Sequence, residues 1–392
     1  SSMTAGLMNE ATTVSTVEDL SNRLEKLGSF VSINSGNDFT TLRIRTLTKN
    51  LDETIAIAKE KLLKPKFDDV DFNRDKANAL QNIKAAKRNA GATASNVFNL
   101  IMYGKDNNFA YPTAGTEASL AAITLDDVKA FYAANYSPKV TTITAVSDLG
   151  EAKMKQALSA FADWDGADVE NSTTKPFPEL AANTLYFIDK PDAPQSEIRI
   201  GKRALPYDAT GEYYKSRVMN FALGGAFNSR INLNLREDKG YTYGARSFFN
   251  GNETRGFYQA SAAVRADATK ASIEEFMKEM NNYNGSGITA EELNFTQAAL
   301  GQRDARNYET PRQKLGFLNQ MQTYGLAPSF VDKQARILKS LTKAEIDALA
   351  NKHVKTSDMI VVVVGDKKTQ IPELKSLGMT IVELDGDGNP AE

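Results

Sequence analysis

Two side chains in the second half of the sequence could stabilise negative charge on an oxygen. Arg236 and Tyr243 are seven positions apart, and a guanidinium and a phenol O–H are both donors that suit a developing oxyanion. The spacing alone favours a simpler interpretation, in which Arg236 lies on a solvated helix face beside Glu237 and Asp238, and Tyr243 packs in a strand. The sequence around Arg236 and Tyr243 is therefore needed to decide between a functional pair and a purely structural one.

Other residue types that carry chemistry are scarce. The chain has no cysteine and one histidine among its 392 residues, which excludes disulfide scaffolds, thiolate zinc fingers, iron–sulfur proteins and cysteine hydrolases. His353 falls at a predicted helix end, where a lone histidine is most often a cap or a surface residue. Gly224 and Gly225 come without a Gly-x-Gly-x-x-Gly pattern or a Walker lysine, so they predict a tight helix junction rather than a phosphate loop.

Composition and charge exclude further classes. The chain has 47 Lys and Arg against 49 Asp and Glu, for a formal net charge of -2, and its basic residues are dispersed. Nucleic acid is therefore not expected as a partner. The longest apolar run, residues 359–364, is far shorter than the roughly 20 residues of a membrane helix and predicts a buried strand. No membrane association is expected.

Helices and strands that could position the pair have clear signals. The alternating residues Tyr241, Tyr243, Ala245 and Ser247 would lie on one face of a strand, so this segment is predicted to be a strand. Ser15 to Glu18 has capping-box spacing, which predicts the start of a helix that ends at Gly28. Apolar stripes at residues 51–62 and 273–280 predict two further helices, each with one buried face.

The two halves of the chain resemble each other, which predicts an internal repeat. Three pairs of segments match at offsets of 218, 221 and 212: the helix that leads to a closing strand (123–148 and 341–366), the start of a long polar helix (67–72 and 288–293), and a helix that ends at a glycine before a hairpin (Gly28 and Gly240). Small changes of offset are what loop insertions produce. The chain is therefore interpreted as two copies of one unit of roughly 200 residues, not as a solenoid.

Each copy has the order helix, antiparallel strands, helix, two long helices, then a helix and a closing strand. This order predicts a strand at residues 141–146 in the first copy and at 359–364 in the second. The fold class is α+β, with two repeated domains in which helices pack on an antiparallel-rich sheet. The first domain is expected at residues 1–165, a polar linker at 166–182 and the second domain at 183–392.

The segment from Leu223 to Gly244 carries the most specific pattern: a paired glycine followed by Ser-Arg, Leu-Arg and Gly-Tyr-x-Tyr. It resembles the C-terminal domain of the pitrilysin/insulinase family of zinc metallopeptidases, which includes mitochondrial processing peptidase. The resemblance covers essentially the whole chain, since residues 65–67, 111–115 and 364–366 also fit the family's pattern. It implies a clamshell of two halves, each made of two such domains, that encloses a chamber for unfolded peptides.

The resemblance also implies that this chain lacks the family's metal site. Active members carry an inverted zinc motif, His-x-x-Glu-His, and a third ligand, Glu, about 75 to 80 positions later. Ser2, Ala5 and Gly6 stand where the motif's His, Glu and His would be. Asn82 falls at the position of the third ligand, and a neutral amide is a weak zinc ligand. The chain is therefore expected to hold no metal and no cofactor, with zinc in a partner half.

The same resemblance gives Arg236 and Tyr243 a role, because the corresponding pair in the family reaches from the non-zinc domain into the active site. The equivalent positions in the first copy are Leu24 and Val31, so the second domain alone bears the pair. We expect Arg236 and Tyr243 to bind substrate and to contact a peptide carbonyl or its transition state.

The expected function is that of a non-catalytic half or subunit of a pitrilysin-family zinc metalloprotease. Inactive alone, the chain would close the chamber, bind peptide partly by strand addition at an open sheet edge, and supply Arg236 and Tyr243 to the partner's zinc site. The zinc-bearing half would be part of the same protein or a separate subunit. The alternative is a structural scaffold of the same fold without a proteolytic role.

The family normally has a strand and a helix before the region of Thr12, so the first domain is expected to be N-terminally truncated. An open sheet edge left by that truncation would allow self-association. No signal peptide is visible at the start of the sequence. The compartment stays open; for a bacterial source the periplasm is expected, with the signal upstream of this sequence.

Overall fold

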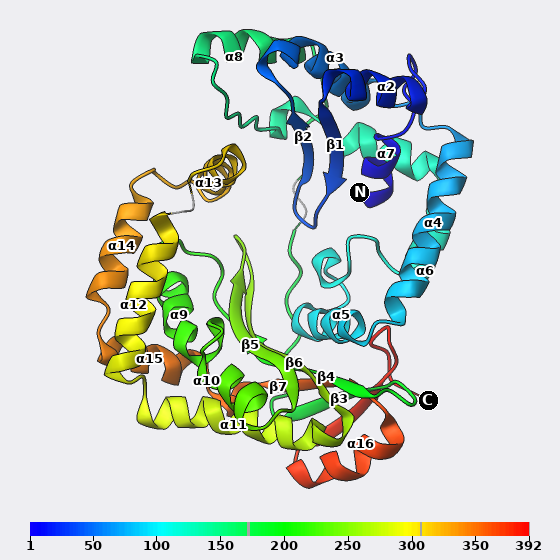
Figure 1. The fold of residues 1–392 in the computed structure, drawn as a ribbon. Coiled ribbons are helices and arrows are strands. Elements are labelled where there is room, and N and C mark those ends of the chain that lie inside the picture. The colour runs from blue at the N-terminus through cyan, green and yellow to red at the C-terminus, as the bar shows by residue number, and fades with distance from the viewer. Residues whose placement is uncertain (171–172, 306–307, 392) are drawn as a thin grey trace. The chain divides into compact units, whose positions relative to one another are not determined.

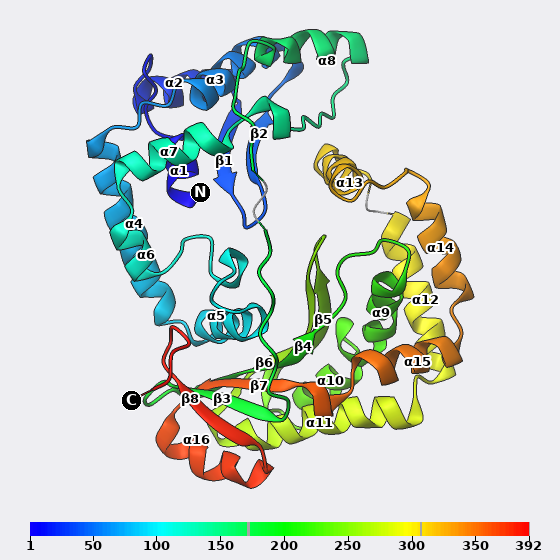
Figure 2. The same ribbon diagram turned by 180° about the vertical axis from the view of Figure 1, so that it is seen from behind.

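A computed structural model describes residues 1–170, 173–305 and 308–391 of the chain. The chain forms two compact units, seen from opposite sides in Figure 1 and Figure 2. Unit 1 comprises Ser1–Ala86 and Lys105–Lys175, and unit 2 comprises Lys87–Gly104 and Pro176–Glu392. The predicted linker at 166–182 contains Asn171 and Ser172, which lie outside the described residues.

Unit 1 surrounds one antiparallel hairpin with helices. The hairpin is β1 (Phe30–Ser35) and β2 (Thr40–Arg45), and the helices are α1 (Ser2–Leu7), α2 (Val17–Leu27), α3 (Leu51–Leu63), α4 (Asp69–Lys87), α6 (Glu117–Ala122), α7 (Leu125–Asn135) and α8 (Glu151–Leu158). Helix α2 has the predicted capping box, but Thr16 and Asp19 form it, one residue later than Ser15 and Glu18. The predicted stripe of α3 is buried at Ile55, Ala58 and Leu62.

The strand predicted at residues 141–146 of the first copy is wrong. These residues form no strand and pair with none in the described part of unit 1. In unit 2 the equivalent strand, β7 (Ile360–Gly365), pairs with β3 (Thr184–Asp189) on one side and β4 (Gln195–Arg203) on the other. A strand needs such neighbours to satisfy its backbone groups, and the described residues of unit 1 offer only β1 and β2.

Unit 2 is built on a six-stranded sheet in the order β5-β6-β4-β7-β3-β8, in which β3 runs parallel to β7 and β8 and the other neighbours are antiparallel. Its remaining strands are β5 (Thr242–Gly251), β6 (Gly256–Arg265) and β8 (Thr380–Leu384). Its helices are α5 (Ala90–Tyr103), α9 (Glu212–Asn220), α10 (Arg230–Asn232), α11 (Thr269–Ser286), α12 (Ala290–Ala305), α13 (Pro311–Thr323), α14 (Phe330–Ser340), α15 (Lys343–His353) and α16 (Lys367–Leu374). The predicted α+β class with antiparallel-rich sheets is confirmed.

The sheet of unit 2 is covered on both faces. Ile198 and Ile200 of β4 lie in the core with the predicted stripe of α11, whose Phe276 is fully buried. Helix α5 packs on β4 and β7, with the Phe98 ring 5.6 Å from that of Phe257, and Met102 O accepts a hydrogen bond from Arg203. A helix from before the predicted linker thus completes the core of unit 2.

The outer edge of β5 is closed by side chains rather than left open. Asn232 Oδ1 accepts a hydrogen bond from Ala245 N at 2.9 Å, and Asn220 Nδ2 donates to Ser247 O at 2.8 Å. The Tyr213 hydroxyl donates to Phe249 O, two residues further along β5. A peptide could not add as a strand along this stretch without displacing these contacts, so the expected strand addition does not fit β5.

The single histidine has a structural position. His353 ends α15, is 7% exposed and bonds through Nε2 to Glu212 at the start of α9. Burial lowers the pKa of His353, although Glu212 acts in the opposite direction. Among the described helices, none is both long and apolar enough to cross a lipid bilayer.

Candidate functional site

Arg236 lies in a π-helical segment, Leu233–Asp238, that follows α10 directly. Its guanidinium lies over the ring of Phe227, 4.6 Å from the centroid, and the side chain is 34% exposed. Nη1 is 3.4 Å from Glu237 Oε1, yet it is buried and forms no hydrogen bond. Stacking therefore limits the movement of the guanidinium, and because Nη1 is shielded, only the exposed part of the group could meet a ligand.

Tyr243 lies at a β-bulge. The pairing of β5 with β6 shifts register between Thr242 and Ala245, so Tyr243 and Gly244 together stand opposite one residue, Ala263, and β5 has one extra residue. A bulge turns a side chain away from the face that alternation would give it. Tyr243 is 94% exposed, whereas Ala245 is 4% exposed. The phenol thus projects into solvent at the start of the strand.

Asn232 connects the segments that carry the two donors. Its Nδ2 donates to Phe227 O at 2.7 Å, and its Oδ1 accepts from Ala245 N at 2.9 Å. The side chain is 4% exposed. One buried amide therefore links Phe227, whose ring lies under Arg236, to β5 two residues after Tyr243. Asn232 is thus a positioning residue that sequence reasoning missed.

Arg230 anchors the segment from the other side. Its guanidinium forms two short bonds to the carboxylate of Glu292, at 2.5 and 2.6 Å, and donates to Gly287 O at 2.9 Å. It also lies 4.8 Å from the centroid of the Tyr283 ring. The arginine of the Ser-Arg motif is thus a structural residue, because it ties α10 to the first turn of α12.

Gly224 allows the preceding helix turn to touch β5. A Cβ at this position would lie 2.1 Å from Ser247 Oγ and 2.6 Å from Ser247 N. This close approach, not phosphate binding, accounts for the glycine, in line with the predicted tight junction.

Replacing Gly224 by alanine should lower the free energy of unfolding by about 2 to 3 kcal/mol, because the backbone of β5 would have to move. Gly316→Ala in α13 is the matched control, since nothing lies within 4 Å of the added Cβ. Denaturant unfolding of both variants measures the difference. Equal stability of the two variants would show that the contact with Ser247 is not limiting.

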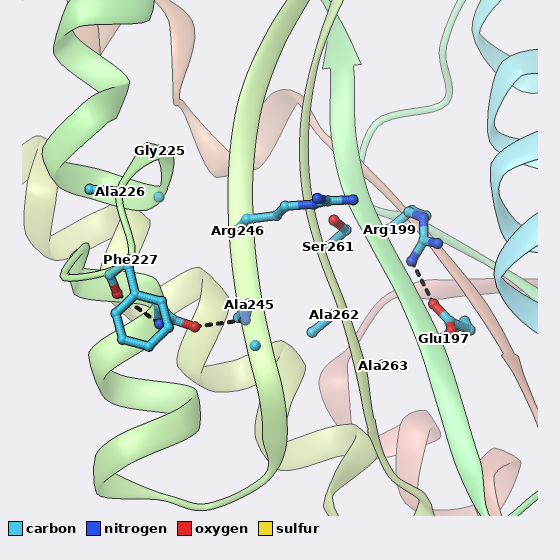
Figure 3. A pocket seen from close by; sticks show the side chains of 13 residues that line it. Glu197, Arg199, Gly225, Ala226, Phe227, Ala245, Arg246, Ser261, Ala262 and Ala263 are labelled. Atoms are coloured by element: carbon cyan, nitrogen blue, oxygen red, sulfur yellow. Dashed lines mark hydrogen bonds and ion pairs between the residues drawn. The ribbon is translucent and has the colours of Figure 1, made fainter. Parts of the chain in front are cut away.

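A cavity of about 540 Å³ borders the pair, and Figure 3 shows the side chains that line it. Its walls come from the loop after Gly224, from α10, and from β4, β5 and β6; they include Phe227, Asn232, Gly244, Arg246, Ser261 and Arg199. Phe227 carries the Arg236 guanidinium and Gly244 follows Tyr243 in the chain. Neither Arg236 nor Tyr243 lines the cavity itself, but each is next to a residue that does, and all the lining residues belong to unit 2.

The positions expected to lack zinc ligands lie on α1 and α4 of unit 1. Ala5 is buried with 2% exposure, and Asn82 is exposed on α4. In the described residues, no three His, Cys, Asp or Glu side chains are grouped so that they could hold a metal ion. The hydroxyl, methyl and hydrogen side chains of Ser2, Ala5 and Gly6 do not fit zinc.

The sequence is similar to one described family and to several curated proteins. The model of the family described as "Peptidase M16 inactive domain" matches residues 122–300. "Uncharacterized zinc protease YmxG" of Bacillus subtilis is 20% identical over 284 residues, which are 72% of this chain and 68% of that protein. "Non-peptidase homolog YmxG" of Helicobacter pylori is 21% identical over 367 residues, which are 93% of this chain and 84% of that protein.

Solved structures show the same fold. A peptidase M16 inactive domain from Pseudomonas fluorescens superposes with a TM-score of 0.84 at 23% identity, over 93% of this chain and 87% of that one. The periplasmic protease PqqL from Escherichia coli gives a TM-score of 0.76 at 15% identity, over 93% of this chain but 40% of PqqL. At these identities the two structures show the fold alone; the family resemblance stated from the sequence is confirmed by the match of the peptidase M16 inactive-domain model to residues 122–300.

Proposed function

We propose, from the premise that this chain carries a peptidase M16 inactive domain, that it is the non-catalytic half of a two-part zinc protease. It would close the chamber, bind peptide and supply Arg236 and Tyr243 to a zinc site held by the partner half. The observation that supports this role is the pair itself: two donors, each next to a residue that lines a cavity and one of them 94% exposed, on a segment fixed by buried contacts.

The chemistry of the pair suits peptide hydrolysis. Attack on a peptide carbonyl places negative charge on its oxygen, and donors that are already in place stabilise that charge without reorganisation. Stacking on Phe227 limits the movement of the Arg236 guanidinium. The Tyr243 side chain is exposed to solvent, so its hydroxyl can donate a hydrogen bond to a bound peptide.

The domain limits at 1–165 and 183–392 are part of the same proposal. Gly28 and Gly240, which are 212 positions apart, both have left-handed backbone, with φ of 58° and 62°. The same offset relates Ile33 to Ala245, and each of them donates its N–H to an asparagine side chain. Both hairpins are thus held by the same device.

The partner half would be a segment of the same protein or a second chain. This chain spans 40% of PqqL, a periplasmic protease with room for a second half of similar size. By analogy we place the pair of halves in the periplasm, with zinc in the half that this chain lacks.

The direct test is an assay of the chain alone and mixed with a zinc-bearing M16 half from the same source. The chain alone should cleave no peptide, the zinc-bearing half alone should be slow, and the mixture should hydrolyse unfolded peptides in a reaction that a chelator stops. Zinc-dependent hydrolysis by the isolated chain would refute the proposal.

A structural scaffold is the second candidate. It is favoured by the Helicobacter pylori relative, which is named a non-peptidase homolog and matches 93% of this chain. In that case the mixture would be no more active than the zinc-bearing half alone.

A further inference from the structure

The cavity beside Arg236 carries a row of polar side chains from three neighbouring strands. Arg246 of β5 lies opposite Ser261 of β6, and Ser261 lies opposite Arg199 of β4. Residues directly opposite in antiparallel strands share a face, with Cβ atoms about 5 Å apart. Figure 3 shows the three side chains together at the cavity. Two guanidinium groups thus flank one hydroxyl.

Two members of this row have no hydrogen-bond or ion-pair partner in the part of the chain that the structure describes. Ser261 is 6% exposed, and its hydroxyl lines the cavity without a hydrogen bond. The Ser261 hydroxyl is not among the buried polar atoms without a partner, so it is open to the cavity, where it can bond to water or to a ligand. Arg246 is exposed and forms no ion pair; its guanidinium has only a ring contact with Phe248, at 6.0 Å.

The third member is held in place by its own contacts. Arg199 Nη1 donates to Glu197 Oε2 at 2.8 Å, and Nη2 donates to Gly91 O in the first turn of α5 at 3.3 Å. The side chains of Arg199 and Glu197 are 12% and 20% exposed. Glu197, the one acidic residue that lines the cavity, is therefore paired, and the positive charge of Arg246 is not balanced there.

We propose that this cavity binds a carboxylate group of a peptide, held by Arg246 and Ser261 with Arg199 behind them. The fork of a guanidinium matches two carboxylate oxygens, and a hydroxyl adds a third donor. The volume of about 540 Å³ suits a side chain or a chain end. The inference rests on the proposed function, since the peptide would be the one presented to Arg236 and Tyr243, and it adds a preference for peptides that present a carboxylate.

Two sources of the carboxylate are distinguished by three labelled probes. Each is an alanine-rich decapeptide: the first has a central glutamate and an amidated end, the second a central glutamine and a free C-terminal carboxylate, and the third a central glutamine and an amidated end. Fluorescence anisotropy with the full chain measures each dissociation constant. A carboxylate-bearing probe should bind about tenfold or more tighter than the third probe. Tighter binding of the first probe would identify a glutamate side chain as the ligand, and tighter binding of the second would identify the C-terminal carboxylate.

Arg246→Gln should remove this advantage and leave binding of the third probe unchanged. Arg246→Lys should keep only part of it, because an ammonium lacks the fork. Arg312→Gln, at an exposed position of α13, is the matched loss of one charge and should change nothing. Circular dichroism checks that each variant is folded. Equal binding of all three probes, or equal losses in Arg246→Gln and Arg312→Gln, would overturn the proposal.

The two proposals fail separately. Binding needs no partner half, so a carboxylate preference can be seen even if the chain has no part in hydrolysis. Conversely, a reconstituted protease that depends on Arg236 but binds the three probes equally would keep the proposed function and remove the carboxylate site.

Discussion

Replacing Arg236 by alanine should lower the turnover of the reconstituted protease by about 100- to 1000-fold, the usual effect of removing one donor to an oxyanion. The loss should fall on kcat more than on KM, because the charge develops in the transition state. Tyr243→Phe should reduce turnover in the same direction, since it removes the hydroxyl alone. Steady-state kinetics with a quenched fluorescent peptide measures both variants.

Both variants should still fold. Tyr243 is 94% exposed, and Arg236 Nη1 has no hydrogen bond to the described residues. Arg236→Ala loses the stack on Phe227, so unfolding free energies should stay within about 1 kcal/mol. Arg265→Ala is the control, because Arg265 is an exposed arginine of β6 paired with Asp267. Full turnover of Arg236→Ala and Tyr243→Phe in a folded chain would favour the scaffold.

Replacing Arg230 by alanine should destabilise unit 2 by about 3 to 5 kcal/mol, because it leaves Glu292 largely buried without its cation. The two side chains are 17% and 25% exposed. Denaturant unfolding measures the loss. Arg265→Ala again provides the control, since its ion pair is 58% and 71% exposed and should contribute at most about 1 kcal/mol.

The same pair predicts a dependence of stability on pH. Burial alone would raise the pKa of Glu292, but hydrogen bonds from Arg230 and Thr289 lower it overall. A carboxyl with a lowered pKa in the folded state stabilises the fold above its unfolded pKa of about 4.3, and this stabilisation is lost as the pH falls through the folded value. Glu292→Gln should therefore weaken the loss of stability below about pH 4.3. An unchanged acid profile would mean that other carboxyls dominate.

Periodicity in the sequence predicts much of the fold, as the helices at 51–62 and 273–280 and the buried strand at 359–364 illustrate. It does not predict the bulge at Tyr243, because the alternation through Tyr241 and Ala245 is unbroken in the sequence. The bulge depends on contacts between elements: Thr242 Oγ1 donates to Ala263 O and accepts from Gly244 N. No local pattern carries that information.

The candidate site shows the same limit. The family resemblance points to Arg236 and Tyr243 but does not separate them from Arg230, a residue of the same motif. Arg230 turns inward only because Glu292, 62 positions later, meets it. Similarly, the preference proposed for Arg246 and Ser261 depends on strand register, which places together residues that are 15 positions apart in the sequence.

A nick in the segment between residues 176 and 182 would not release a free C-terminal fragment. Helix α5, fully buried at Val97 and Phe98, would remain docked on the far fragment, so the two pieces should copurify until denatured. A fragment that starts at residue 183 would lack helix α5, which packs on β4 and β7. It should be recovered in soluble form only when residues 87–104 are co-expressed with it.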